Sequence, residues 1–364
     1  MIGSFAARMA QIRSPERARR FPIVVTIALA LACVSCGSTA GSTTATSRAR
    51  RTVPASTTAT APTGTSATGT GTGTAGTGTA TTPLPGAGKP TVTIGDKNYT
   101  EQFVLGQLYL QALQAQGFTV DLNPNIGPTE VTVQALSSGT LGMYPEYLDT
   151  FNTAIAGDQR TYRTQLDAYD AAERYALAHG LELLGPTPFS DTDAIAVTVG
   201  YAADNRLSSI GDLRRVAGGL TLGGPPQFQQ GPPGLPQITT AYGVTPAAFK
   251  SLAVGDQYNE LNQNTVQAAD VNTTDGQLAS GNYALLADPH RIFGWGNVVP
   301  VISSKVLAAE GPDFAATIDR VDAKLTTTAM RQLNEAIDVA KLDPAAVAKV
   351  FLETHRLLTP GSSG

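Results

Sequence analysis

Cysteine, histidine and tryptophan are all scarce in this chain of 364 residues, which has two Cys, three His and one Trp. Cys33 and Cys36 are so close in sequence that a disulfide between them would close a very small loop and stabilise little. His179, His290 and His355 stand in separate segments, without the Cys, Asp or Glu neighbours that a metal site needs. We therefore expect no disulfide in the folded part, no metal, no cofactor and no catalytic residues.

Positive charge is also in short supply. The chain has 25 Lys and Arg against 29 Asp and Glu, which gives a net charge of −4. The first 35 residues carry five Arg and one Glu, so a chain without this segment would have a net charge of −8. This balance disfavours nucleic acids and acidic membrane surfaces as partners.

Residues 1–35 have the pattern of a lipoprotein signal peptide. Five arginines precede an apolar run from Phe21 to Ala32, which is too short to span a bilayer comfortably. Cys33 has the better small residues before it, whereas Cys36 has the better residues after it, so the sequence leaves open which cysteine is lipidated. We expect an exported protein that is lipid-anchored to the outer face of the cell membrane.

Large apolar residues are nearly absent from residues 36–88, which consist mainly of Thr, Gly, Ala, Ser and Pro. Such a composition cannot bury enough surface to offset the entropy of ordering, and it predicts a disordered tether. Gly71, Gly73 and Gly76 match a dinucleotide-binding motif by letter only, because no strand precedes them and no helix follows.

About 275 residues remain from Lys89 onward, enough for a sizeable folded part. Strand patterns at Val92 to Ile94, Ala194 to Thr198 and Val298 to Ile302 alternate with helical patterns, which predicts a three-layer α/β fold. Glycine and proline between 218 and 236 predict a loop, and a helix is expected around residues 245–252. Near the C-terminus, Asp343 followed by proline predicts a capped helix.

The segment from Thr91 to Leu113 reads as a strand that turns directly into a helix. Asn98 and Glu101 have the spacing of a capping box, so the helix is expected to begin near Asn98. A helix N-terminus beyond a strand offers free N–H groups to a ligand, and nearby polar side chains could add contacts, although most such turns bind nothing. These side chains belong to Lys97, Tyr99, Thr100 and Gln102.

Several blocks agree in order with one known family. They are the run from Lys97 to Glu101, Gln134-Ala135-Leu136 with Tyr144-Pro145-Glu146-Tyr147, Val271 to Leu278, and Pro300-Val301. Over roughly Thr91 to Leu358 the chain resembles the osmoprotectant substrate-binding proteins of ABC importers for glycine betaine, choline and carnitine.

The resemblance implies a two-lobed fold of the type II periplasmic-binding-protein kind, with the ligand in the cleft between lobes. Lobe I would comprise 89–192 plus 300–364, and lobe II would comprise 193–299. The implied partners are a small-molecule solute and the transmembrane permease of an ABC importer, with ATP hydrolysed by a separate subunit. The expected state is a monomer, and closure of the lobes on the solute is the implied mechanism.

The aromatic cage that the family uses for quaternary ammonium ligands is largely altered in this chain. Tyr144 remains at one expected position, and Tyr147 and Tyr99 are expected on the same side. An aspartate, Asp193, stands where a family tyrosine belongs, and another family tyrosine falls at Gly296. Trp295 beside it could restore a ring. Asn272 and Gln229 also lie in altered family blocks, and the block around Gln229 lacks its arginine.

A cleft lined by polar groups and one or two rings predicts a more polar solute, hydroxylated or amide-bearing. The residues are Asp193, Asn272, Gln102, Gln229, Tyr144 and Trp295. Two alternatives stay open: a quaternary-ammonium receptor with a rebuilt cage, and a lipid-anchored interaction protein with a degenerate cleft. A catalytic carboxylate pair of Glu146 and Asp149 is less favoured than structural hydrogen bonding.

Overall fold

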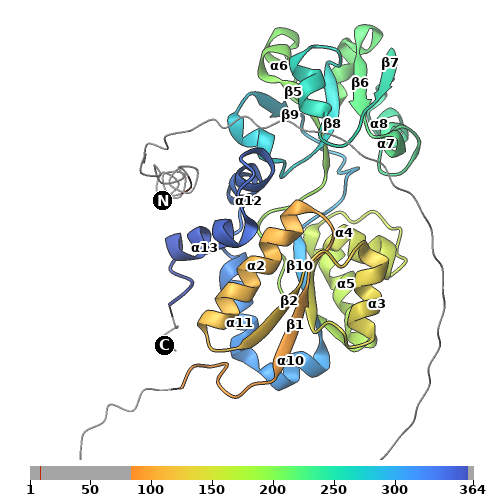
Figure 1. Ribbon diagram of the computed structural model, residues 1–364. Coiled ribbons are helices and arrows are strands. Elements are labelled where there is room, and N and C mark those ends of the chain that lie inside the picture. The colour runs from red at the N-terminus through yellow and green to blue at the C-terminus, as the bar shows by residue number, and fades with distance from the viewer. Residues whose placement is uncertain (1–8, 10–82, 360–364) are drawn as a thin grey trace, which may run out of the picture. The chain divides into compact units, whose positions relative to one another are not determined.

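Two five-stranded mixed sheets organise the part of the chain that the structure describes (Figure 1). The computed structural model describes Met9 and residues 83–359. The predictions of a signal peptide, an acylated cysteine and most of the tether therefore lie outside the described residues. Within 83–359, no helix is long and apolar enough to cross a membrane.

The first sheet has the order β2-β1-β3-β10-β4. Strands β2, β1 and β3 run parallel, whereas β10 runs antiparallel to both β3 and β4. All five residues of β3 are buried, because helices cover both faces of the sheet. The strands are β1 (Thr91–Gly95), β2 (Thr119–Asn123), β3 (Met143–Tyr147), β4 (Leu181–Leu183) and β10 (Val298–Ser303).

Two helical layers sandwich this sheet. On one face α2, α11, α12 and α13 share a core with β1 and β10, and on the other face α3 and α5 pack over β3 and β10 (Figure 1). We call this sheet with its helices lobe I. Its helices are α2 (Thr100–Ala115), α3 (Thr129–Ser137), α4 (Leu148–Thr150), η1 (Phe151–Ile155), α5 (Gln165–Ala178), α10 (Ser304–Glu310), α11 (Pro312–Asp322), α12 (Thr327–Asn334), η5 (Glu335–Val339) and α13 (Pro344–Thr354).

The second sheet has the order β7-β6-β8-β5-β9, and we call it with its helices lobe II. Strands β7, β6 and β8 are parallel, and β5 is antiparallel to β8 and β9. Its elements are β5 (Asp193–Thr198), α6 (Val199–Asn205), η2 (Ile210–Arg215), η3 (Ala217–Gly219), β6 (Thr221–Gly224), α7 (Pro226–Gln230), α8 (Leu235–Tyr242), β7 (Ala248–Ser251), α9 (Gln257–Asn262), β8 (Ala268–Asn272), η4 (Gly276–Ser280) and β9 (Tyr283–Leu285).

The α/β class and the three predicted strands are confirmed, and so is the last helix. Asp343 accepts a hydrogen bond from the backbone N–H of Ala346, as an N-cap should. Two local predictions were wrong: residues 218–236 contain β6 and α7, and residues 248–251 form β7 rather than a helix. In β6 and β7, pairing with the neighbouring strands outweighs the local glycine, proline and helix signals.

The predicted capping box at the start of α2 does not form. Helix α2 begins at Thr100, after Tyr99, and its start has no side-chain cap. Glu101 instead accepts hydrogen bonds from the Tyr147 hydroxyl and from Asn334 Nδ2, each at 2.8 Å. A tertiary contact has therefore replaced the local one.

Within residues 83–359, lobe I and lobe II are joined at the following places. Two are the segments that run from β4 to β5 and from β9 to β10, which pair through a bridge between Ser190 and Asn297. The third is a contact between α12 with η5 of lobe I and the Thr273–Ser280 turn of lobe II. There Arg331 Nε donates to the Thr273 carbonyl oxygen at 2.7 Å.

We expect Gly276→Ala to destabilise the protein by about 1–3 kcal/mol, the usual cost of overpacking a filled site. A Cβ at Gly276 would lie 2.4 Å from the backbone nitrogen of Glu335, and neither backbone can yield without moving an element. Urea unfolding measures the change. Gly185→Ala is the control, because a Cβ there meets nothing within 4 Å. Equal stability of the two variants would contradict the tight contact.

Candidate solute-binding site

A cavity of about 770 Å³ lies where the two lobes face each other. Lobe I contributes the start of α2, the end of β3 and the segment after it, and η5. Lobe II contributes the start of β5, the end of β8, the turn after β8, and the start of α9. The site thus combines strand ends with a helix N-terminus, where ligands commonly bind in open α/β sheets.

Four aromatic rings line this cavity, from Tyr99, Tyr147, Tyr258 and Phe293. Tyr99 and Tyr147 stack with ring centroids 5.8 Å apart and planes inclined by 25°. Tyr99 is 38% exposed, whereas Tyr147 is buried and donates its hydroxyl hydrogen to Glu101. The lining of the cavity therefore includes one exposed and one buried tyrosine ring.

A buried lysine lies against the stacked tyrosines. The Lys97 ammonium is 5.5 Å from the ring centroid of Tyr99 and 5.0 Å from that of Tyr147. Its charge is paired with Glu146, and Thr129 Oγ1 lies 3.2 Å from the Lys97 nitrogen. Lys97 and Glu146 are 3% and 0% exposed, so the pair lies beneath the cavity and out of water. The protein itself thus places a cation against these rings.

Six carboxyl groups line the cavity, against a single basic side chain, Lys341. They belong to Glu101, Asp149, Asp191, Asp193, Asp275 and Asp338. Among the ion pairs of residues 83–359, none involves any of these six. Within residues 83–359 these carboxyl groups are therefore not neutralised by direct ion pairs.

Burial raises the pKa of several of these carboxyl groups because ionised oxygens lose their hydration there. The pKa of Asp149 rises to about 7 and that of Asp193 to about 6, with burial the largest cause of both shifts. Burial also raises the pKa of Glu101 and of Asp191. A positively charged group entering the cavity would reverse these shifts.

Two acceptor oxygens at the cavity have no hydrogen-bond partner among the described residues. Asp191 accepts from Asn272 Nδ2 at 3.2 Å through Oδ2, while its Oδ1 is unpartnered. Asn334 donates through Nδ2 to Glu101 and to the Thr274 carbonyl oxygen, while its Oδ1 is unpartnered.

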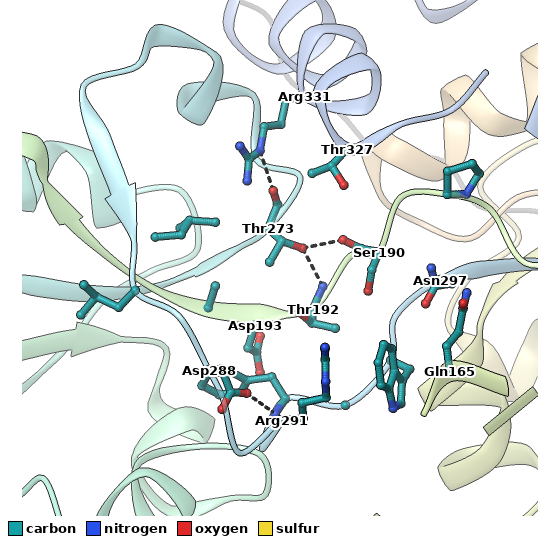
Figure 2. Close-up of a pocket in the computed structure, with 17 residues that line it drawn as sticks. Gln165, Ser190, Thr192, Asp193, Thr273, Asp288, Arg291, Asn297, Thr327 and Arg331 are labelled. Atoms are coloured by element: carbon teal, nitrogen blue, oxygen red, sulfur yellow. Dashed lines mark hydrogen bonds between the residues drawn. The ribbon is translucent and has the colours of Figure 1, made fainter. Parts of the chain in front are cut away.

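A second cavity of about 500 Å³ lies beside the two crossing segments (Figure 2). It shares Thr192, Asp193 and Phe293 with the first cavity. Trp295 belongs to this second cavity, donates its indole N–H to the Tyr162 carbonyl oxygen at 3.1 Å, and stacks under the Arg291 guanidinium at 4.1 Å. Its ring is therefore already engaged within the protein.

The predicted site residues fall into three groups. Tyr99, Thr100, Tyr147, Asp193 and Asn272 line the first cavity. Lys97, Gln102 and Tyr144 are buried and line neither of the two cavities. Trp295 lines the second cavity only, and Gln229 is exposed on α7 and lines neither.

Gly296 cannot carry the tyrosine that the family pattern expects there. A Cβ at this position would lie 1.6 Å from the carbonyl oxygen of Asp191, because the two crossing segments touch at this point. The family tyrosine therefore has no counterpart at Gly296 in this fold.

Sequence reasoning missed a larger set of cavity residues. They include Asp191, Tyr258, Asp275, Phe293 and Asn334. Asp191 is two residues from Asp193, and Asp275 lies in the same family block as Asn272, so these two had a signal. Tyr258, Phe293 and Asn334 come from distant segments that only the fold brings together. No group of three or more His, Cys, Asp or Glu suited to a metal ion occurs in the described part of the chain.

Two α/β lobes with a solute-sized cavity between them define a two-lobed solute-binding protein. The family model for the substrate-binding domain of the ABC-type glycine betaine transport system matches residues 90–354, and the chain belongs to this family. It is an extracytoplasmic substrate-binding protein of a glycine betaine-type ABC transporter and works with a permease. This confirms the family assignment and the expectation of a binding protein rather than an enzyme.

Curated relatives agree over most of their length. The glycine-betaine-binding protein of Pseudomonas aeruginosa is 30% identical over 286 residues, which cover 75% of this chain and 91% of that one. Glycine betaine-binding protein YehZ of Escherichia coli is 31% identical over 276 residues, which cover 72% of this chain and 90% of that one.

Solved structures confirm the fold. A structure titled as a glycine betaine/carnitine/choline ABC transporter superposes with a TM-score of 0.69 at 22% identity, covering 73% of this chain and 99% of that one. Ligand-free YehZ from Escherichia coli gives a TM-score of 0.65 at 30% identity, with the same coverage.

We expect the ligand-free protein to melt a few degrees higher at pH 5.5 than at pH 8.5. Burial raises the pKa of Asp270 to about 9, beside about 7 for Asp149 and about 6 for Asp193, whereas an unfolded aspartate titrates near 4. A carboxyl group whose pKa is higher in the folded state holds its proton more tightly there than in the unfolded chain. The resulting stabilisation of the folded state is fully present below the unfolded pKa and is lost as pH rises through the folded pKa. Differential scanning fluorimetry across this range measures the trend.

Asp270→Asn should flatten this pH dependence, because it removes the group with the highest of these three values. Asp204→Asn is the matched control, since Asp204 is exposed on α6. A melting temperature that stays constant or falls toward pH 5.5 in the unchanged protein would contradict the interpretation.

Proposed function

We propose that this protein is a lipid-anchored receptor that captures a small polar solute in the first cavity and delivers it to an ABC permease. The proposal assigns lobe I to 89–192 plus 300–364 and lobe II to 193–299, with a signal peptide at 1–35 and a tether at 36–88. It takes the working form to be a monomer. Closure of the lobes on the solute would give the permease a distinct shape to bind.

The observation that carries the choice of solute is the charge of the cavity. Six carboxyl groups face one lysine, and Asn272 and Thr100 add neutral hydrogen-bonding groups. Burial of so many acidic groups costs free energy unless a solute or protons compensate them. A solute with a cationic nitrogen and further polar groups fits this lining, and an apolar solute does not.

The rings of Tyr99, Tyr147, Tyr258 and Phe293 favour a second candidate. Four rings around one cavity could hold a quaternary ammonium through cation–π contacts. Tyr258 and Phe293 would then rebuild the cage at positions different from those expected in the family. Glycine betaine itself also carries a carboxylate, for which this lining offers a single basic side chain.

A third candidate is an interaction protein with a degenerate cleft. Against it stand the size of the cavity and the orderly burial of Lys97 with Glu146 beneath it. A cleft without a function would have no reason to keep so costly an arrangement.

A calorimetric panel with the purified protein tests the proposal. We expect binding from amines or other cationic polar solutes, and weaker binding or none from neutral polyols. The panel includes glycine betaine, choline, carnitine, amino acids and sugars. Tight binding of glycine betaine would favour the rebuilt cage, and no binding by any member of the panel would favour the interaction protein.

Asp193→Ala should weaken binding of the preferred solute, and unchanged affinity would remove Asp193 from the site.

Acylation is tested in a bacterial expression host with a clickable fatty-acid analogue. We expect label on the unchanged protein and its loss in one of the single variants, Cys33→Ser or Cys36→Ser, because one cysteine becomes the modified N-terminus. The other single variant is the control. Labelling that persists in the double variant, or that is absent throughout, would rule out the lipid anchor.

A further inference from the structure

We infer that the solute presents a nitrogen cation that still carries N–H hydrogens, a primary or secondary ammonium or a guanidinium, to Asp191 and Asn334. This inference rests on the proposed function and adds the chemistry of the recognised group. It sets the solute apart from a quaternary ammonium, whose nitrogen has no hydrogen to donate.

Asn334 provides the clearest sign of a missing donor. Its side chain is 4% exposed and lines the cavity. The orientation of its amide is fixed, because Nδ2 donates to the Thr274 carbonyl oxygen at 2.9 Å, a group that can only accept. Its Oδ1 must therefore be the free acceptor, and it has no partner among the described residues. A buried acceptor of this kind requires a donor.

Asp191 supplies a second free acceptor in the same cavity. Asn272 Nδ2 occupies Oδ2, whereas the buried Oδ1 accepts no hydrogen bond of normal geometry among the described residues, although the Thr274 side chain lies near the carboxyl group. Because Asp191 lies on a crossing segment and Asn334 ends α12, the two acceptors come from parts of the chain that join the lobes. A donor that bonds both would connect these parts.

The carboxyl groups that line the cavity favour a cation as the missing donor. Two of the nearby basic side chains are already committed: Lys97 pairs with Glu146, and Arg331 Nε donates to the Thr273 carbonyl oxygen. Lys341 lines the cavity and forms none of the ion pairs of the described residues. A neutral hydroxyl could satisfy one acceptor, but only a cation would stabilise the ionised forms of carboxyl groups whose pKa burial raises.

A methylation series separates this inference from the alternatives. Ethanolamine, N-methylethanolamine, N,N-dimethylethanolamine and choline share one skeleton and carry three, two, one and no N–H hydrogens when charged. Calorimetry on the unchanged protein should show affinity falling along the series, with ethanolamine at least tenfold tighter than choline. Glycine, sarcosine, dimethylglycine and glycine betaine repeat the test on a zwitterionic skeleton.

Asp191→Asn should lower the ratio of ethanolamine to choline affinity at least threefold, because it replaces a charged acceptor by an amide. Asp204→Asn makes the same change of charge at an exposed position outside both cavities and should leave the ratio unchanged. If a variant fails to fold, the methylation series measured on the unchanged protein still tests the inference.

The outcomes separate the two levels of the proposal. Affinity that rises with methylation, or that does not vary with it, overturns the inference and leaves a solute receptor in place. Binding of neutral solutes together with no binding of any amine also overturns it. No binding by either series or by the wider panel overturns the proposed function, and the inference falls with it.

Discussion

A charge buried between the lobes must be compensated, and this constraint governs the site. Lys97 and Glu146 meet it internally: each is almost fully buried, and each compensates the other beneath the stacked rings of Tyr99 and Tyr147. The carboxyl groups above them have no such partner, and burial raises the pKa of Asp149 and Asp193 into the neutral range. The protein therefore compensates one pair of buried charges internally, while the carboxyl groups that line the cavity form no ion pair among the described residues.

The fold was largely predictable, because it depends on patterns that are local or repeated. Alternating strands, the proline and aspartate at the start of α13 and the order of the family blocks each define an element or its place without knowledge of the others. The errors arose where a tertiary contact outweighed a local signal. Glu101 has the spacing of a helix cap but bonds Tyr147 and Asn334, and residues 248–251 form an edge strand beside β6.

The site was only half predictable, for a related reason. Residues beside recognisable blocks, such as Tyr99 and Asn272, reach the cavity. Gln229 and Trp295 do not: Gln229 is exposed on α7, and the indole N–H of Trp295 bonds the Tyr162 carbonyl oxygen beside the second cavity. Tyr258 carries no sequence signal, since it reaches the cavity through the packing of α9, and Asn334 is matched only as part of the family block Leu333-Asn334. Side chains that line a cleft between lobes depend on how both lobes pack, and a single sequence gives that information poorly.

The contact between α12 with η5 and the turn after β8 is built largely from backbone groups. Gly276 touches the backbone of Glu335, and Arg331 and Asn334 bond carbonyl oxygens rather than particular side chains of the turn. Cavity-lining residues of lobe II outside this turn, such as Tyr258, can therefore be exchanged without removing these contacts. In evolutionary terms, residues such as Tyr258 can vary with the solute while the attachment is kept, whereas a change at Asn334 would affect solute binding and attachment together.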